Sequence, residues 1–260
     1  VGDTLVALGP DMKTIHPLLA KSWEVSEDGK LYTFHLRDDV TFCSGKKFTA
    51  ADVKATIDRW LGLDKGVVKN RAGDVKEIRA VDDYTVDFVT DAPNPILHYE
   101  WATWYIMDKE WAEANGAEAP TDVTGGTENY ATRNANGTGP FMIQSRETDV
   151  KTVMVPFEGW WDTPNKTHNL TEVIFTPIGS DSTRVAALLS GEIDMMYPVP
   201  VQDMNRLEND PNSEVLGGPE LRTIFLGMDQ ERDELLHSSV KGKNPFKDVR
   251  VRKAISMAIS

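Results

Sequence analysis

The sequence predicts an α/β protein, because strand and helix patterns follow one another closely within one stretch near the N-terminus. Residues Leu19 to Arg37 hold two runs in which hydrophobic and polar residues alternate, joined by Asp28-Gly29. Alternation on both sides of an Asp-Gly dipeptide is typical of a β-hairpin with one buried face. Thr49 then precedes hydrophobic residues at helical spacing, and Asp52 follows three positions later, the pattern of a capped helix N-terminus.

The rest of the chain predicts further strands and helices. A second hairpin is expected from Val75–Val81 and Tyr84–Thr90, with the inward residues Ile78, Val86 and Phe88. Later extended segments are expected over Phe141–Arg146, Thr152–Pro156, Thr171–Pro177, Ile193–Tyr197 and Leu221–Met228, and helices over 108–115, 182–189, 201–208 and from Asp248, with Val251, Ala254, Ile255 and Ala258 on one face. Residues 118–139 lack hydrophobic periodicity and are expected to be a loop. We expect a mixed sheet, and a separate subdomain of hairpins and helices over residues 1–133.

Composition limits the class of protein. The chain has 260 residues, 40% of them hydrophobic, which is enough for one large or two ordinary domains. Its net charge of −13 disfavours nucleic acid and anionic membrane surfaces as partners. No hydrophobic run approaches the roughly 18 residues that a transmembrane helix needs. Cys43 is the single cysteine, so no intrachain disulfide is possible, and we expect it to be a small turn or core residue.

The motifs that would carry catalysis are not found. Gly137-Thr138-Gly139 lacks both the third glycine of a dinucleotide loop and a following Gly-Lys-Ser/Thr, so it predicts a turn before a strand. The five histidines are widely spaced, which disfavours zinc, and no Gly-x-Ser-x-Gly elbow occurs. We therefore predict no catalytic residue, no metal and no cofactor. An acidic glycoside hydrolase stays open as an alternative, because carboxylates and tryptophans are plentiful.

Two tryptophans are candidates for a binding role. Trp101 and Trp104 lie in a short aromatic segment between a proline-rich stretch and a predicted helix. Stacking on a ligand and packing in the core are both compatible with this position, and the sequence leaves the choice open.

The ordered residues of the N-terminal half resemble the peptide-type solute-binding proteins of ABC importers, the group that binds dipeptides, oligopeptides and nickel. The matching residues are Leu19-Ala20, Ser22-Trp23, Asp28-Gly29, Tyr32 to Arg37, Val40 to Phe42, Gly45 and Thr49 to Val53. The resemblance continues through Asn136 to Phe141, Trp160-Trp161, Ser190 to Asp194 and Asn244 to Ala254. Cys43-Ser44 departs from the family, which often has His-Asp in that turn.

The resemblance implies a fold and a domain plan. The implied fold is periplasmic-binding-protein-like (type II, cluster C), with a first lobe that carries an extra subdomain and a second lobe that is largely missing. The chain is therefore interpreted as an internal fragment. The implied parts are an extra subdomain over 1–133, the core of the first lobe over 134–228, and the hinge with the start of the second lobe over 229–260.

The resemblance also implies a function: a two-lobed clamp that captures a peptide or similar small solute outside the cytoplasm, in the periplasm or at the cell surface, and delivers it to an ABC permease. The alternative ligands are an opine or other amino-acid conjugate and a nickel chelate. The full-length protein is expected to be a monomer. Tyr197 ends the short predicted strand after Gly-Glu-Ile-Asp, and in the resembled proteins the residues just after that strand face the ligand. Arg222 opens a hydrophobic strand leading to the hinge, where it grips a ligand carboxylate or forms a structural salt bridge.

Overall fold

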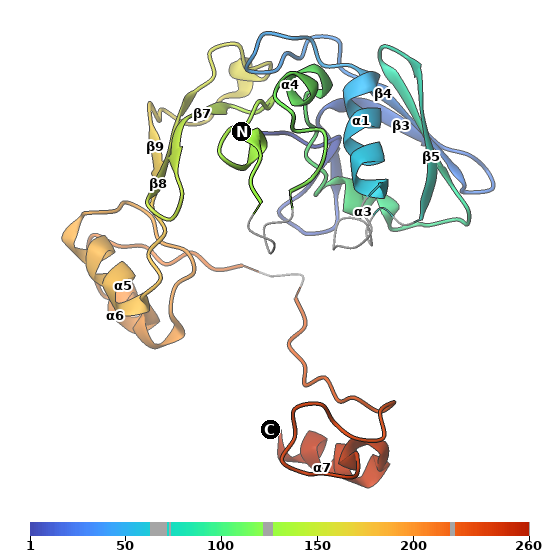
Figure 1. The fold of residues 1–260 in the computed structure, drawn as a ribbon. Helices are drawn as coiled ribbons and strands as arrows, with labels where there is room; N and C mark the ends of the chain where they lie inside the picture. The colour runs from blue at the N-terminus through green and yellow to red at the C-terminus, as the bar shows by residue number, and fades with distance from the viewer. Residues whose placement is uncertain (63–71, 73, 122–126, 219–221, 260) are drawn as a thin grey trace. The chain divides into compact units, whose positions relative to one another are not determined.

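The chain folds into two compact units, Val1–Gly217 and Gly218–Ser260. The computed structural model describes residues 1–62, 72, 74–121, 127–218 and 222–259. Figure 1 shows the elements of both units, which are described separately below. None of the helices in these ranges is long and hydrophobic enough to cross a membrane.

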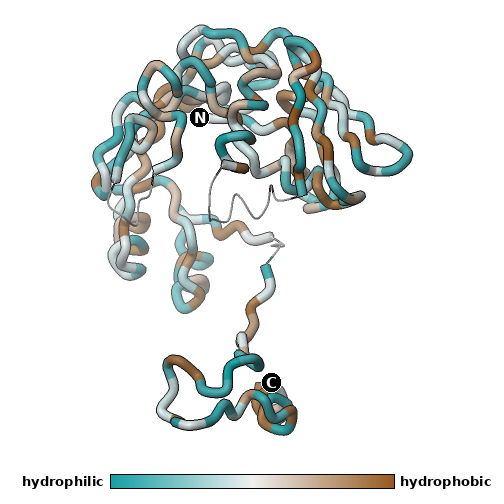
Figure 2. The backbone as a smooth tube through the Cα atoms, turned by 45° about the vertical axis from the view of Figure 1, so that its right-hand side comes forward, coloured by the Kyte–Doolittle hydropathy of each residue, from teal (hydrophilic) through white to brown (hydrophobic). Residues whose placement is uncertain are grey.

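A four-stranded sheet dominates the first unit, and both predicted hairpins are confirmed in it. Its strands are β3 (Ala20–Val25), β4 (Leu31–Leu36), β5 (Val75–Asp82) and β6 (Thr85–Thr90), in the order β3-β4-β6-β5. All three pairings are antiparallel. Gly29 has a φ of +67°, the left-handed conformation that the Asp-Gly turn predicts. Every second residue of β4 and β6 is buried, so one face of the sheet is turned toward the core. Figure 2 shows hydrophobic and hydrophilic residues interspersed along the backbone of this unit.

Helix α1 (Ala50–Leu61) packs against β5 and β6 of this sheet and against α4 (Lys109–Ala114). The predicted capping box is present at its start, where the Asp52 carboxylate accepts a hydrogen bond from the Thr49 N–H at 3.0 Å. Val53 and Ile57 on the inward face of α1 are completely buried. The periodicity read from the sequence therefore corresponds to a helix that is held mainly by the contacts of its hydrophobic face.

An aromatic cluster fills the space between the sheet and the short helix α3 (Leu97–Trp101). The Trp101 ring lies edge-on to Phe34 at 4.6 Å between centroids, and 4.9 Å from Phe88. The predicted inward residues Ile78, Val86 and Phe88 are all buried in the same core. Each buried aromatic side chain removes a large hydrophobic area from water, so this cluster anchors the subdomain.

The second part of the unit is a smaller sheet with two helices. Strands β7 (Phe141–Glu147), β8 (Lys151–Pro156) and β9 (Val173–Phe175) pair in that order, again antiparallel. Helix α5 (Asp181–Ser190) begins at the cap Ser180 and ends at Gly191, which is left-handed. Helix α6 (Met204–Glu208) follows a short 3-10 turn over Val201–Asp203, and Val185, Met196 and Leu207 form a small core. The remaining elements of the unit are β1 (Val6–Leu8), β2 (Ile15–Pro17) and the 3-10 turns Tyr130–Thr132 and Thr163–Asn165.

The N-terminal residues join the two parts of the first unit. Asp3 O accepts from Ile106 N at 3.1 Å, while the Val1 carbonyl accepts from Gly139 N at 2.9 Å. A Cβ on Gly137 would overlap the Val1 carbonyl, so the backbones approach each other here more closely than a side chain permits. The Gly-Thr-Gly sequence is thus the turn that leads into β7, and its glycines make room for residues 1–3. The proposed boundary at residue 133 stays a prediction.

The second unit carries the predicted last helix, α7 (Val249–Ala258), after a 3-10 turn at Pro245–Lys247. The Asp248 carboxylate caps it by accepting from Arg250 N at 2.8 Å, as expected. Asn244 donates to the carbonyls of Asp229 and Arg232 at 2.9 and 2.8 Å and so closes the preceding loop. No residue of α7 is buried within the described ranges, so its hydrophobic face, with Val251 and Ile255, is only partly covered.

Three expectations about strands are wrong. Residues 193–197 form no strand, and Met195 and Tyr197 of this segment are exposed. Residues 222–228 of the expected strand Leu221–Met228 are also irregular and exposed, while Leu221 lies outside the described residues. A strand needs a neighbour for its backbone hydrogen bonds, and no strand among the described residues pairs with either segment. The sheets are antiparallel throughout these residues, so the mixed sheet is not observed.

Candidate functional site

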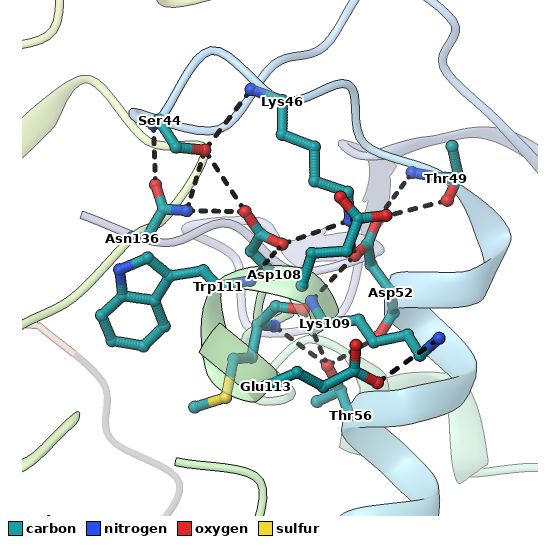
Figure 3. Close-up of polar contacts among 12 residues, drawn as sticks. Ser44, Lys46, Thr49, Asp52, Thr56, Asp108, Lys109, Trp111, Glu113 and Asn136 are labelled. Carbon is teal, nitrogen blue, oxygen red and sulfur yellow. Dashed lines mark hydrogen bonds and ion pairs between the residues drawn. The ribbon is translucent and has the colours of Figure 1, made fainter. Parts of the chain in front are cut away.

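A buried ionic cluster stands where the first turns of α1 and α4 meet the turn that precedes α1 (Figure 3). The Lys46 ammonium lies 2.5 Å from Asp52 Oδ1 and 3.2 Å from Asp108 Oδ1. Gly45, with a φ of +86°, gives the turn the conformation that directs the following residue toward α1. Both carboxylates are almost completely buried, so each depends on its hydrogen bonds and on the shared cation.

Lys46 stays protonated in this setting. Burial lowers the pKa of the ammonium, but the bonds with Asp52 and Asp108 outweigh burial, and the net pKa is raised above its usual value. The cluster also includes backbone donors: Lys109 N donates to Asp52 Oδ1 at 3.0 Å, and Trp111 N donates to Asp108 Oδ1 at 3.1 Å. The two aspartates therefore hold the starts of both helices to one cation.

Asn136 connects this cluster to the loop that enters β7. Its Nδ2 donates to Asp108 Oδ2 at 2.7 Å and to Ser44 Oγ at 3.0 Å. Its Oδ1 accepts from Ser44 N at 2.9 Å. Asn136 is only 8% exposed, and these three hydrogen bonds fix the orientation of its side-chain amide. Chain segments near residues 44, 108 and 136 are thereby fixed to one another.

A groove with a cavity volume of about 240 Å³ lies next to Asn136. Three segments line it: the N-terminal residues, the stretch from Tyr105 to Trp111, and the loop from Ala131 to Gly137. The Tyr105 side chain is 62% exposed, and Trp111 is partly exposed with its ring 5.6 Å from that of Tyr130. Exposed aromatic faces beside buried polar groups are the usual composition of a small-molecule site.

A second group of polar contacts holds the N-terminal segment, whose residues Val1 and Gly2 line the groove. Asp3 Oδ2 accepts from Trp161 Nε1 and from Thr138 Oγ1, both at 3.1 Å. Burial raises the pKa of Asp3, and the hydrogen bonds from Trp161 and Thr138 offset only part of this increase. The Arg37 guanidinium lies over the Trp161 ring, with its central carbon 4.2 Å from the ring centroid.

Of the residues that the sequence singled out, Trp101 and Trp104 lie together, with their ring centroids 6.2 Å apart. Trp101 and Trp104 are 0% and 2% exposed, so the core-packing alternative describes them and we do not carry them forward as ligand residues. Their indole N–H groups have no hydrogen-bond partner within the described residues. Tyr197 is 82% exposed on the segment between α5 and α6. Arg222 is exposed and belongs to the second unit. The binding roles of Tyr197 and Arg222 stay predictions.

The sequence patterns do not identify the groove residues Tyr105, Trp111 and Asn136 as candidates for a binding role. Tyr105 follows directly after Trp104, but nothing in the pattern distinguishes an exposed aromatic residue from a buried neighbour in so short a segment. The Asn136 side chain is buried in a loop rich in glycine, and an asparagine that leads into Gly-Thr-Gly-Pro is the one signal that was available.

Metal and thiol chemistry find no support at this site. No three His, Cys, Asp or Glu side chains are grouped to hold a metal ion within the residues that the structure describes. Cys43 is half-buried, and burial raises the pKa of its thiol. A raised pKa disfavours the reactive thiolate, in agreement with the expectation of a turn or core residue.

Comparison with known proteins gives the family. The family model for bacterial extracellular solute-binding proteins, family 5 Middle, matches residues 14–260. The dipeptide-binding protein of Escherichia coli K12 is 31% identical over 94% of this chain and 45% of its own. The binding protein AgaA from A. tumefaciens R10, solved with agropinic acid, covers 81% of this chain and 40% of its own, with 28% identity and a TM-score of 0.69.

A nickel ABC transporter protein from Bacillus halodurans covers 80% of this chain and 39% of its own, with 32% identity and a TM-score of 0.64. The chain thus spans less than half the length of these relatives. The predicted resemblance and the predicted fold, one lobe of a periplasmic-binding-protein-like structure, are confirmed by these matches. The chain belongs to the bacterial extracellular solute-binding proteins, family 5.

Proposed function

We propose that this chain supplies one wall of the ligand cleft of an ABC-importer solute-binding protein, and that the groove beside Tyr105 contacts the ligand. The observation that carries the proposal is the groove itself, in which the exposed ring of Tyr105 and the partly exposed ring of Trp111 stand beside buried polar groups. The family membership supports capture of a solute outside the cytoplasm and delivery to membrane permease subunits. Closure of a second wall over the groove would shift the population toward the liganded form.

A peptide is the favoured ligand, because the dipeptide-binding relative matches over most of this chain. The AgaA and nickel transporter structures keep an opine and a nickel chelate as alternatives. Backbone amides and aromatic rings suit a short peptide, since a peptide offers both polar and hydrophobic surface to such a groove. These relatives are transport-associated binding proteins, so we propose binding without turnover. No observation among the described residues favours the glycoside hydrolase alternative.

The test uses the full-length protein. Native mass spectrometry identifies the solute that co-purifies, and calorimetry measures the affinity for dipeptides, for an opine and for a nickel–histidine complex. Tyr105→Ala is expected to weaken binding about 10-fold or more, equal to about 1.4 kcal/mol, by removing the aromatic face. Val81→Ala, which removes an exposed hydrophobic side chain outside the groove, serves as the control. Unchanged affinity in Tyr105→Ala would remove the groove from the ligand site.

Tyr197 and Arg222 are tested in the same assay. Tyr197→Ala shows whether the exposed ring between α5 and α6 also meets the solute. Arg222→Ala is expected to weaken binding of an anionic ligand roughly 10- to 100-fold, in line with about 1.5–3 kcal/mol for a hydrogen bond to a charged group. Arg222→Lys should restore only part of that affinity, because an ammonium cannot form the bidentate fork.

A further inference from the structure

The ionic cluster of Lys46, Asp52 and Asp108 lies directly behind the groove, and ligand contact does not explain it. Two buried carboxylates share one ammonium, and a third carboxylate, that of Glu110, lies 3.9 Å from Lys46 with a largely exposed side chain. The buried part therefore carries a net negative charge. Ionic groups of this kind are costly to bury, and hydrophobic residues of similar volume often stabilise a fold as well or better. Their arrangement thus points to a task other than stability.

The cluster reaches two walls of the groove through one carboxylate (Figure 3). Asp108 Oδ1 accepts from the Trp111 N–H at 3.1 Å, and Asp108 Oδ2 accepts from Asn136 Nδ2 at 2.7 Å. Trp111 and Asn136 both line the groove, and they come from different segments of the chain. Asp108 caps α4 through the Trp111 N–H, and its second oxygen thereby ties the start of α4 to the loop that holds Asn136.

The charge on Lys46 keeps this carboxylate in place. Lys46 donates to Asp108 from one side, and Asp52 fixes Lys46 through the 2.5 Å contact at the first turn of α1. Charge-assisted hydrogen bonds are shorter and about twice as strong as neutral ones, so they define distance more sharply. An apolar filling would support the same volume, but it would remove the acceptor of the Trp111 N–H and one of the two acceptors of Asn136 Nδ2.

We propose that Lys46, Asp52 and Asp108 are positioning residues that fix the spacing of Trp111 and Asn136 across the groove. This inference rests on the proposed function, since it assigns the purpose of the spacing to ligand capture. The side chains act through Trp111 and Asn136, and they do not touch the solute themselves. The alternative is that the cluster only stabilises the starts of α1 and α4, in which case ligand affinity would not respond to its removal.

The experiment measures groove geometry without a ligand. The full-length protein is labelled with 5-fluorotryptophan, and the Trp111 resonance is assigned by its loss in Trp111→Phe. Asp108→Asn and Lys46→Met are expected to shift and broaden this resonance, because Trp111 loses its fixed separation from Asn136. Lys46→Arg, which keeps the charge, should restore a single sharp line. The resonance of Trp23, on β3, serves as an internal reference.

The structural control is Val53→Ala, which creates a cavity on the buried face of α1 without removing any member of the cluster. The variants are compared with it at temperatures equally far below their own Tm. The proposal is overturned if the Trp111 line moves in Val53→Ala as much as in Asp108→Asn. It is also overturned if the line moves in neither Asp108→Asn nor Lys46→Met. If Asp108→Asn does not fold, Lys46→Met and Lys46→Arg carry the same comparison.

Binding is the second readout, with L-alanyl-L-alanine as the probe. If the wild-type protein binds it, Asp108→Asn should bind at least about tenfold more weakly, while Val53→Ala binds like wild type. Equal affinity of Asp108→Asn and wild type would contradict the positioning role. If the wild-type protein binds no probe, the proposed ligand is wrong, and the fluorine spectrum still decides whether the cluster sets the spacing.

Discussion

The guanidinium of Arg37 lies over the indole ring of Trp161, with its central carbon 4.2 Å from the ring centroid. Arg37 follows directly after β4, whereas Trp161 lies in the segment between β8 and β9. The contact therefore joins the four-stranded sheet to the smaller sheet within the first unit. The same indole donates to Asp3, so three distant parts of the chain meet at one ring.

Arg37→Ala is expected to destabilise the protein by about 0.5–2 kcal/mol, the range of a cation–π contact between exposed and desolvated limits. The Arg37 side chain is 27% exposed and also pairs with Asp39, so the value should lie inside that range. Chemical denaturation of the two proteins measures the difference. Arg79→Ala is the control, because the Arg79–Glu77 pair is exposed, and this variant should leave stability almost unchanged. Equal losses in both variants would show that the ring adds nothing.

Asp3→Asn is expected to raise the Tm at pH 7. The folded pKa of Asp3 is raised by burial above its usual value of 3.8, so folding favours the protonated carboxyl. The ionised group therefore costs stability at neutral pH, and this cost disappears as the pH falls through the raised pKa toward 3.8. Asparagine keeps an acceptor for Trp161 and Thr138 without the charge. Thermal unfolding from pH 3 to 8 should show the gain shrinking in acid, whereas a lower Tm for Asp3→Asn at pH 7 would mean that the ionised form is favoured.

The hairpins and helix caps were predictable because their signals are local. Asp28-Gly29 fixes a turn, and Thr49 with Asp52 fixes a helix start, whatever the rest of the chain does. The segments 193–197 and 222–228 have equally good strand composition, but they lack a neighbour among the described strands and do not form strands. The composition of a segment indicates its tendency to form a strand, but the presence of a partner strand depends on the whole fold.

The candidate site was harder to predict than the fold. Trp101, Trp104 and Tyr105 lie within one short aromatic segment, yet the first two fill the core and only Tyr105 reaches the groove. The groove arises where three segments meet, from residues near 1, 105–111 and 131–137. Sequence patterns within one segment do not show such a meeting, because it depends on long-range contacts such as Gly139 N to the Val1 carbonyl.

Gly137→Ala is expected to destabilise the protein by about 1–3 kcal/mol, the usual cost of an overpacked site. The new methyl group would overlap the Val1 carbonyl, which is backbone and cannot rotate away. Residues 1–3 would have to separate from the loop before β7. Gly179→Ala is the matched control, since nothing among the described residues lies within 4 Å of an added Cβ there. Urea unfolding compares the two, and an equal, small effect in both would contradict the close approach.

Trp101→Phe tests the choice between core packing and ligand stacking that the sequence left open. The ring is fully buried against Phe34 and Phe88, so a smaller ring leaves a cavity, and stability should fall by about 1–3 kcal/mol. Because the side chain has no exposed surface to offer, the affinity for the co-purified solute should stay within twofold of wild type, measured by calorimetry well below the Tm. Tyr105→Phe is the companion variant: it keeps the exposed ring and should leave stability unchanged. A Trp101→Phe protein of normal stability that binds the solute weakly would return Trp101 to the ligand site and show that the core described above opens when the solute is bound.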